Sequence, residues 1–285
     1  MSDLKPDGPN SEQIEYWNGQ AGDKWVDAQE NLDPALEPVG IAAMETVGVK
    51  RGERVIDLGC GCGSTSLELA RRVGPMGSVM GVDISTPMLR RASQRAAEEN
   101  LDNASFINAD ASNYLFEKQA ADLAYSRFGV MFFRNPVEAF TNIHGALKSG
   151  GRLGFACWQP LVKNQWTTMP RNIALRHVEP PEPPHPHDPG PFAFADPDRV
   201  KGILGDAGFG SVEMADHQTD MRNTGTVDEV THFLTYFGPA SKLLAEADDA
   251  TKKAVEDDVR AEVVTRHDGS GVSLDAAMWI VTATA

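Results

Sequence analysis

The stretch Val55-Ile56-Asp57-Leu58-Gly59-Cys60-Gly61-Cys62-Gly63-Ser64 decides the fold. It starts as an apolar run that ends in an acid, and glycines then follow at every second position. This pattern is typical of a buried strand that enters a tight turn and then a helix, where backbone lies close to a ligand and a Cβ cannot be accommodated. We therefore expect a strand-turn-helix unit whose helix begins near Thr65.

Two further apolar segments also end in a carboxylate. Ser78–Asp83 is a short strand pattern, and Asp83 lies 20 residues beyond Gly63, the distance at which a βαβ unit presents an acid to a ribose diol. Ala104–Asp110 is predicted to be the third strand. Because the carboxyl ends of parallel strands meet at one edge of an open sheet, we expect three acids around a common adenosine-binding crevice.

The glycine spacing distinguishes between adenosine ligands. A dinucleotide pattern GxGxxG requires glycine at position 64, which is Ser64, whereas the observed pattern is an acid followed by xGxGxG. In this motif the chain resembles the class I S-adenosylmethionine-dependent methyltransferases. Their ligand has an adenosine but no pyrophosphate, so it needs close backbone approach without an optimised phosphate cradle.

The resemblance extends from residue 53 to the C-terminus. Leu147-Lys148-Ser149-Gly150-Gly151 is similar to the Leu-Lys-Pro-Gly-Gly turn before the family's fifth strand, with serine in place of proline. Ala207-Gly208-Phe209 resembles the turn into the sixth strand, and Met278–Ala283 the seventh strand. The implied fold is α/β, a Rossmann-like doubly wound seven-stranded sheet with its last strand antiparallel and with helical lid insertions.

The resemblance also implies roles at matching positions. Asp57 would lie beside the methionine amino group, Asp83 would accept both ribose hydroxyls, and Asp110 would accept the adenine amino group. The other cofactor-binding residues that the resemblance implies lie on the glycine turn, beside the adenine, after the fourth strand and in the N-terminal segment: Gly59, Gly61, Gly63, Ile84, Met88, Ala111, Ser126, Arg127, Trp17 and Trp25.

Composition narrows the functional classes. The net charge of −15 leaves no basic face large enough to follow a phosphate backbone, which disfavours a nucleic-acid substrate. No apolar run reaches the ~18 residues of a membrane span, so we expect a cytoplasmic protein without membrane insertion. With 285 residues and 41% hydrophobic content, the chain can bury one large α/β core. The oligomeric state is not readable from the sequence.

The cysteines indicate neither disulfides nor a metal. Cys60, Cys62 and Cys157 are too few for a disulfide framework. Cys60-x-Cys62 is a conceivable redox or metal pair, but zinc needs about four ligands and nothing nearby supplies the others. We interpret both residues as small turn residues and expect no metal.

Composition shifts divide the chain into four parts: an N-terminal helical lid segment at 1–50, a cofactor-binding core at 51–160, a proline-rich lid insertion at 161–198, and the rest of the sheet at 199–285 with a helical insertion at 226–267. In the first part, Trp17 and Trp25 either cap the sheet edge or form a lid over the sulfonium. Asp33-Pro34 and Glu37-Pro38 predict turns, and the spacing from Val39 to Val49 predicts a helix.

The sequence does not identify the methyl acceptor. Aromatic residues in the two insertions favour an apolar or aromatic small molecule, although packing onto the core is the simpler interpretation of each one taken singly: Trp166, Phe192, Phe194, Phe233 and Phe237. A general base is needed only for an acceptor that carries a proton on its nucleophile. The candidate catalytic residues are His177, His185, His187, His232 and Arg127.

Two other functional classes stay open. A sheet of this kind also suits an NAD(P)-dependent oxidoreductase, which Ser64 and the lack of an obvious catalytic Tyr-Lys or His pair disfavour. A cofactor-binding protein without catalytic activity is the third possibility. Release of adenosylhomocysteine separates the methyltransferase from both.

Overall fold

The computed structural model describes residues 4–182 and 185–285, and the chain divides into two compact units. The first comprises Met1–Trp158, His187–Asp216 and Met278–Ala285, and the second comprises Gln159–Pro186 and His217–Ala277. Pro183 and Pro184 of the predicted proline-rich insertion lie outside the described residues. The four-part division drawn from the sequence stays a prediction.

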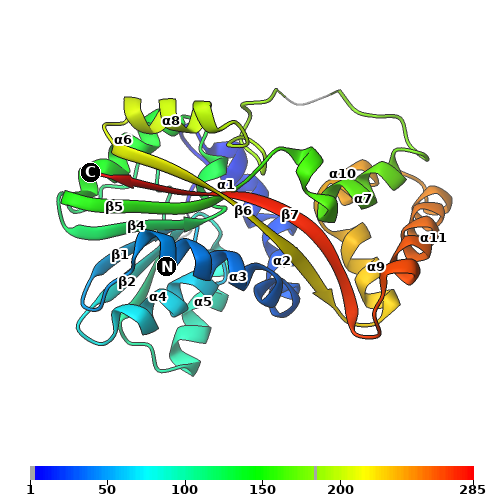
Figure 1. Ribbon diagram of the computed structural model, residues 1–285, viewed down its shortest axis with the longest axis horizontal. Coiled ribbons are helices and arrows are strands. Elements are labelled where there is room, and N and C mark those ends of the chain that lie inside the picture. The colour runs from blue at the N-terminus through cyan, green and yellow to red at the C-terminus, as the bar shows by residue number, and fades with distance from the viewer. Residues whose placement is uncertain (1–3, 183–184) are drawn as a thin grey trace. The chain divides into compact units, whose positions relative to one another are not determined.

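A seven-stranded sheet organises the first unit, in the order β3-β2-β1-β4-β5-β7-β6 (Figure 1). Its strands are β1 (Arg54–Leu58), β2 (Ser78–Asp83), β3 (Ala104–Asn108), β4 (Ala121–Arg127), β5 (Leu147–Trp158), β6 (Gly210–Thr224) and β7 (Gly271–Thr284). The pairs from β3 to β5 are parallel, and β7 runs antiparallel to β5. The predicted fold, including the antiparallel last strand, is confirmed.

Helices cover both faces of the sheet. They are α3 (Gln29–Val47), α4 (Ser64–Val73), α5 (Thr86–Glu98), α6 (Pro136–Ala146) and α8 (Pro197–Asp206). Gly154 of β5 faces α3, because a Cβ there would lie 2.6 Å from Val47 Cβ. The ring of the next residue, Phe155, lies 5.8 Å from that of Phe140 in α6. Since successive side chains of a strand point to opposite faces, α3 and α6 lie on opposite sides of the sheet.

The N-terminal segment forms three consecutive helices, α1 (Ser11–Asn18), α2 (Gln20–Asp27) and α3. The predicted turns at Pro34 and Pro38 are wrong, because both prolines lie inside α3. Because proline has no backbone N–H, the carbonyls of Glu30 and Pro34 do not receive the hydrogen bonds that a regular helix would give them. The helix forms nevertheless because a buried apolar face holds it against the sheet, formed by Leu32, Leu36, Val39, Ala43 and Val47.

The second unit has its own core. It contains η2 (Leu161–Lys163), α7 (Gln165–Ala174), α9 (Val227–Tyr236), α10 (Gly238–Leu243) and α11 (Asp249–Arg266), and parts of β6 and β7. Val255, Val259 and Val263 form the buried stripe of α11. Thr226 and Glu229 form a capping box at the start of α9, which fixes where this helix begins. Helices therefore form within the predicted insertion at 226–267.

No helix among the described residues is both long and apolar enough to cross a membrane. In the first unit, η1 (Val130–Phe132) lies in the loop that follows β4.

Pro38→Ala should stabilise the protein by about 1–2 kcal/mol, because it restores a hydrogen bond inside α3 at a small entropic cost in the unfolded chain. Chemical denaturation followed by circular dichroism measures the change. Pro136→Ala is the matched control, since Pro136 lies in the first turn of α6, where an amide has no helical partner. A lower stability of Pro38→Ala than of Pro136→Ala would contradict the expectation.

Candidate functional site

The turn after β1 has no room for a side chain at its three glycine positions. Gly59, Gly61 and Gly63 have φ angles of 66°, 54° and 84°, which disfavour other residues. A Cβ on Gly59 would lie 2.7 Å from the Cα of Gly129, and one on Gly63 would lie 2.9 Å from the Cβ of Ala92. The glycines therefore allow the loop after β4 and helix α5 to approach the turn.

Asp57 lies at the end of β1 and is fully buried. Its Oδ2 atom accepts hydrogen bonds from Thr65 Oγ1 at 2.7 Å and Ser66 Oγ at 2.6 Å. Its Oδ1 atom is buried without a partner among the described residues. Burial raises the pKa of Asp57 to about 6, although the two hydroxyls and Arg127 oppose the rise. This oxygen lacks a donor and matches a ligand with an N–H group.

The other two acids lie on the neighbouring strands. Asp83 accepts the amides of Gly61 at 2.7 Å and Ser85 at 2.8 Å, and burial raises its pKa. Asp110 follows β3 by two residues, and its Oδ1 atom accepts Asn10 Nδ2 at 3.0 Å. The second oxygen of Asp110 is buried without a partner among the described residues. The acids thus follow β1, β2 and β3 at one edge of the sheet, as the sequence predicts.

Other residues that the resemblance implies for cofactor binding lie near this edge of the sheet. Met88 and Ala111 are buried, and the methyl group of Met88 would lie 2.8 Å from a Cβ on Gly61. Ile84 is half-buried, and its carbonyl accepts Asn18 Nδ2 at 2.8 Å. The Ser126 hydroxyl donates to the Leu58 carbonyl at 2.7 Å and so links β4 to β1.

The predicted N-terminal tryptophans form an aromatic cluster. Trp17 lies edge to face with Trp25 at 5.8 Å and with Phe132 of η1 at 5.5 Å. The Trp17 carbonyl accepts the Ser85 hydroxyl at 2.7 Å. The N-terminal helices therefore contact the loops that follow β2 and β4, and cofactor binding by either tryptophan stays a prediction.

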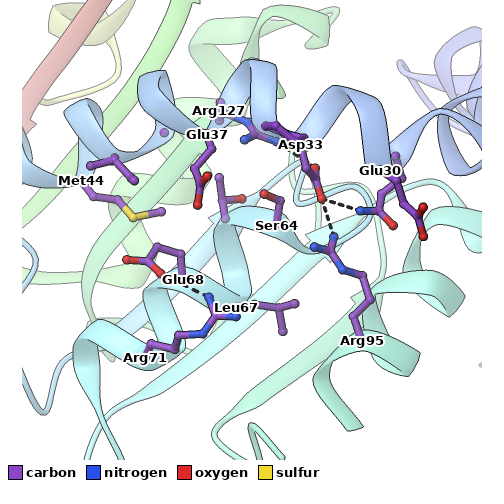
Figure 2. Close-up of a pocket in the computed structure, with 15 residues that line it drawn as sticks. Glu30, Asp33, Glu37, Met44, Ser64, Leu67, Glu68, Arg71, Arg95 and Arg127 are labelled. Carbon is purple, nitrogen blue, oxygen red and sulfur yellow. Dashed lines mark hydrogen bonds and ion pairs between the residues drawn. The ribbon is translucent and has the colours of Figure 1, made fainter. Parts of the chain in front are cut away.

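A cavity of about 320 Å³ lies between α3, α4 and α5 (Figure 2). Arg127, whose side chain is 11% exposed, lines it together with Ser64 and Thr65 at the start of α4. Asp33 of α3 lies 2.9 Å from the Arg95 guanidinium and 4.0 Å from that of Arg127. Figure 2 shows Asp33 projecting from α3 toward both arginines. This carboxylate therefore links α3 to α5 and to the end of β4.

Three polar residues of the site were not predicted from the sequence. Asn10 joins the Asp110 carboxylate to the Arg134 amide, and Asn18 joins the Ile84 carbonyl to the Thr86 amide. In addition to its ion pair with Asp33, Arg95 donates to the Cys62 carbonyl at 2.8 Å. No local pattern marks such residues, because each acts through a partner that is distant in the sequence.

The candidate catalytic histidines have varied surroundings. In the second unit, His177 lies 2.9 Å from Asp258, and His232 is exposed and stacks on Tyr236 at 5.1 Å. His185 also belongs to the second unit, whereas His187 belongs to the first, as does Arg127. No catalytic role follows from these contacts.

Cys60, Cys62 and Cys157 are buried free thiols. Burial raises the pKa of all three, that of Cys62 to about 12, so they stay protonated at neutral pH. In the part of the chain that the structure describes, no group of three or more His, Cys, Asp or Glu residues is placed to hold a metal ion.

The fold and the site define a Rossmann-like adenosyl-binding protein of the methyltransferase class. The Methyltransferase domain family matches residues 49–178. An aklanonic acid methyltransferase from a Streptomyces species is 34% identical over 147 residues, which cover 50% of this chain and 67% of the relative. A demethylmenaquinone methyltransferase from Staphylococcus aureus is 31% identical over 108 residues, which cover 38% of this chain and 44% of the relative.

Solved structures agree on the fold. A phosphoethanolamine N-methyltransferase 2 from Haemonchus contortus, solved in complex with S-adenosyl-L-methionine, matches with a TM-score of 0.59 at 18% identity. The match covers 95% of this chain and 59% of that chain. The chain belongs to the S-adenosylmethionine-dependent methyltransferases.

Asn10→Ala should weaken adenosylmethionine binding by ~3- to 10-fold, because removal of one hydrogen bond loosens the Asp110 carboxylate. Isothermal titration calorimetry measures the affinity. Asn135→Ala is the matched control, since among the described residues the Asn135 side chain bonds only to exposed Glu138. Equal affinities of the Asn10 and Asn135 variants would contradict a positioning role for Asn10.

Asp57 should give unfolding a pH dependence of defined sign. Its pKa is about 6 in the folded protein against an ordinary value of 3.8, so between these values the folded state holds a proton that the unfolded chain releases. The free energy of unfolding therefore falls as pH rises through this window, by up to about 3 kcal/mol, and this contribution is constant above and below it.

Asp57→Asn removes the titrating group and should abolish this decrease. Urea unfolding of the wild type and the variant, from about pH 4 to about pH 7, isolates the effect from other titrating groups. If the unfolding free energies of the wild type and the variant differ by the same amount at every pH in this range, the pKa of Asp57 is not raised.

Proposed function

We propose that this protein transfers the methyl group of S-adenosylmethionine to a small, apolar or aromatic acceptor. Two buried carboxylate oxygens at the carboxyl edge of the sheet, Asp57 Oδ1 and Asp110 Oδ2, carry the proposal. Neither has a hydrogen-bond partner in the part of the chain that the structure describes. Adenosylmethionine carries N–H donors at both ends, on the methionine amino group and on the adenine ring. The open acceptor oxygens of the site therefore fit the donors of this cofactor.

Each acid has its own part in binding. Asp57 would accept the methionine amino group with the oxygen that Thr65 and Ser66 leave open. Asp110 would accept the adenine amino group, while Asn10 and the Ser112 amide hold its other oxygen. Asp83, whose oxygens accept the Gly61 and Ser85 amides, would also accept the ribose hydroxyls.

The bound cofactor supplies an activated methyl group on a sulfonium, which needs no further activation. The protein therefore has to align the acceptor in line with the methyl–sulfur bond and to exclude water. Trp17 and Trp25 would contribute to this exclusion, because the helices that carry them contact the loops after β2 and β4.

The acceptor is proposed to be a small molecule because two relatives, over aligned segments of 147 and 108 residues, are named for polyketide-type and quinone-type substrates. Arg127 lines a cavity beside the start of α4 and would face an anionic group of the acceptor or the methionine carboxylate. Phe194 does not line such a site, since it packs between Phe140 and Phe155 in the core.

Release of adenosylhomocysteine in the presence of phenols, amines and carboxylic acids tests the proposal. Turnover with at least one planar acceptor is expected. Thermal shifts with adenosylmethionine and with NAD provide the binding test, and only the former should stabilise the protein. If NAD stabilises the protein and adenosylmethionine does not, the proposed function is wrong and the protein is instead an oxidoreductase.

Asp83→Ala should weaken adenosylmethionine binding by ~10- to 100-fold, because it removes charge-assisted hydrogen bonds that are worth about 1.5–3 kcal/mol. Asp122→Ala is the matched control. Asp122 lies at the opposite end of its strand, where it accepts the Arg54 amide and Lys148 Nζ. Calorimetry that gives the two variants the same affinity would refute the assignment of Asp83.

A further inference from the structure

Phe128, which follows β4, has an unusual backbone conformation. Its φ angle is 66°, in the left-handed region that bulky residues rarely adopt. Its amide donates to the Ala156 carbonyl at 3.0 Å, so the backbone stays attached to β5. A strained residue of this kind persists only where the surrounding structure holds it, and such residues are concentrated at functional sites.

The strained backbone places the Phe128 ring flat on Trp158, the last residue of β5. The ring centroids lie 4.2 Å apart and the planes differ by 3°. Trp158 is 5% exposed, whereas Phe128 is half-buried. Among the described residues, Phe128 makes no other ring contact, so no second aromatic ring covers its opposite face.

This pair lies beside the glycine turn. The next residue, Gly129, approaches so closely that a Cβ on Gly59 would lie 2.7 Å from its Cα. The acids that fit the cofactor follow β1, β2 and β3, and in the sheet β4 and β5 lie on the other side of β1. In an in-line displacement the acceptor lies beside the methyl carbon, opposite the sulfur. The ends of β4 and β5 carry none of the three acids, which leaves this part of the sheet edge for an acceptor.

We propose that the Phe128–Trp158 pair is the platform on which a planar aromatic methyl acceptor stacks, against the face of Phe128 that Trp158 does not cover. This inference rests on the proposed function and adds the acceptor subsite to it. Offset stacking of a planar ring on Phe128 favours an aromatic acceptor over a saturated one of the same size. The tightly packed Trp158 keeps the Phe128 ring in a fixed orientation.

Calorimetry with naphthol and decahydronaphthol, on protein saturated with adenosylhomocysteine, tests the platform. The wild type should bind the planar naphthol more tightly than its saturated analogue. Phe128→Leu retains bulk and the same backbone strain but loses the ring, so it should weaken naphthol binding by ~3- to 10-fold and leave decahydronaphthol within about twofold. Phe128→Tyr should retain the preference.

Phe209→Leu is the matched control, because Phe209 is a buried aromatic residue that lies away from the carboxyl ends of the parallel strands. The Gly210 carbonyl beside it accepts the hydroxyl of Thr284, which pairs with Arg152 in the first half of β5. This variant should keep both the naphthol preference and the adenosylmethionine affinity of the wild type.

Naphthol binding by Phe128→Leu that equals the wild type would overturn the platform, as would a wild type without any planar preference. Loss of adenosylmethionine binding in Phe128→Leu alone would also overturn it, since Phe128 would then support the cofactor. By contrast, a wild type that shows the Phe128-dependent preference without a cofactor and binds neither adenosylmethionine nor adenosylhomocysteine would leave aromatic binding by Phe128 intact and refute the proposed function.

Discussion

The buried Asp57 carboxylate, held by the hydroxyls of Thr65 and Ser66, is the contact on which the site depends. It ties the end of β1 to the first turn of α4 across the glycine turn. Because the ends of the turn are fixed, the glycines between them must take left-handed conformations, and the loops after β2 and β4 can then pack closely. The close approach of these loops to the glycine turn follows from this short segment.

The fold was predictable because its signals are local. The acids Asp57, Asp83 and Asp110 each follow a short apolar run, and parallel pairing then brings their ends to one edge. The site was predictable only in part. Asn10 and Arg95 act on groups more than 30 residues away, through contacts that no pattern in the sequence encodes. Tertiary contacts were also decisive at Pro34 and Pro38, where packing against the sheet overrides the turn preference of proline.

The proposed cofactor site and most of the candidate acid–base residues belong to different units of the chain. All residues that fit adenosylmethionine belong to the first unit, whereas His177, His185 and His232 belong to the second. An acceptor that is already ionised needs none of these histidines, since alignment suffices for displacement from a sulfonium. The aromatic residues after β4 and β5 can supply that alignment within the first unit alone.

The two unpartnered carboxylate oxygens also connect binding with stability. A buried polar group without a hydrogen bond destabilises a folded protein by about 1–3 kcal/mol, so Asp57 and Asp110 both weaken the ligand-free state. A ligand that donates to both oxygens removes this penalty, and a ligand that binds only the folded state shifts the folding equilibrium toward it. Asn10 ties the N-terminal segment to the same carboxylate. Cofactor binding should therefore stabilise the α1–α3 segment together with the sheet edge, because both depend on Asp110.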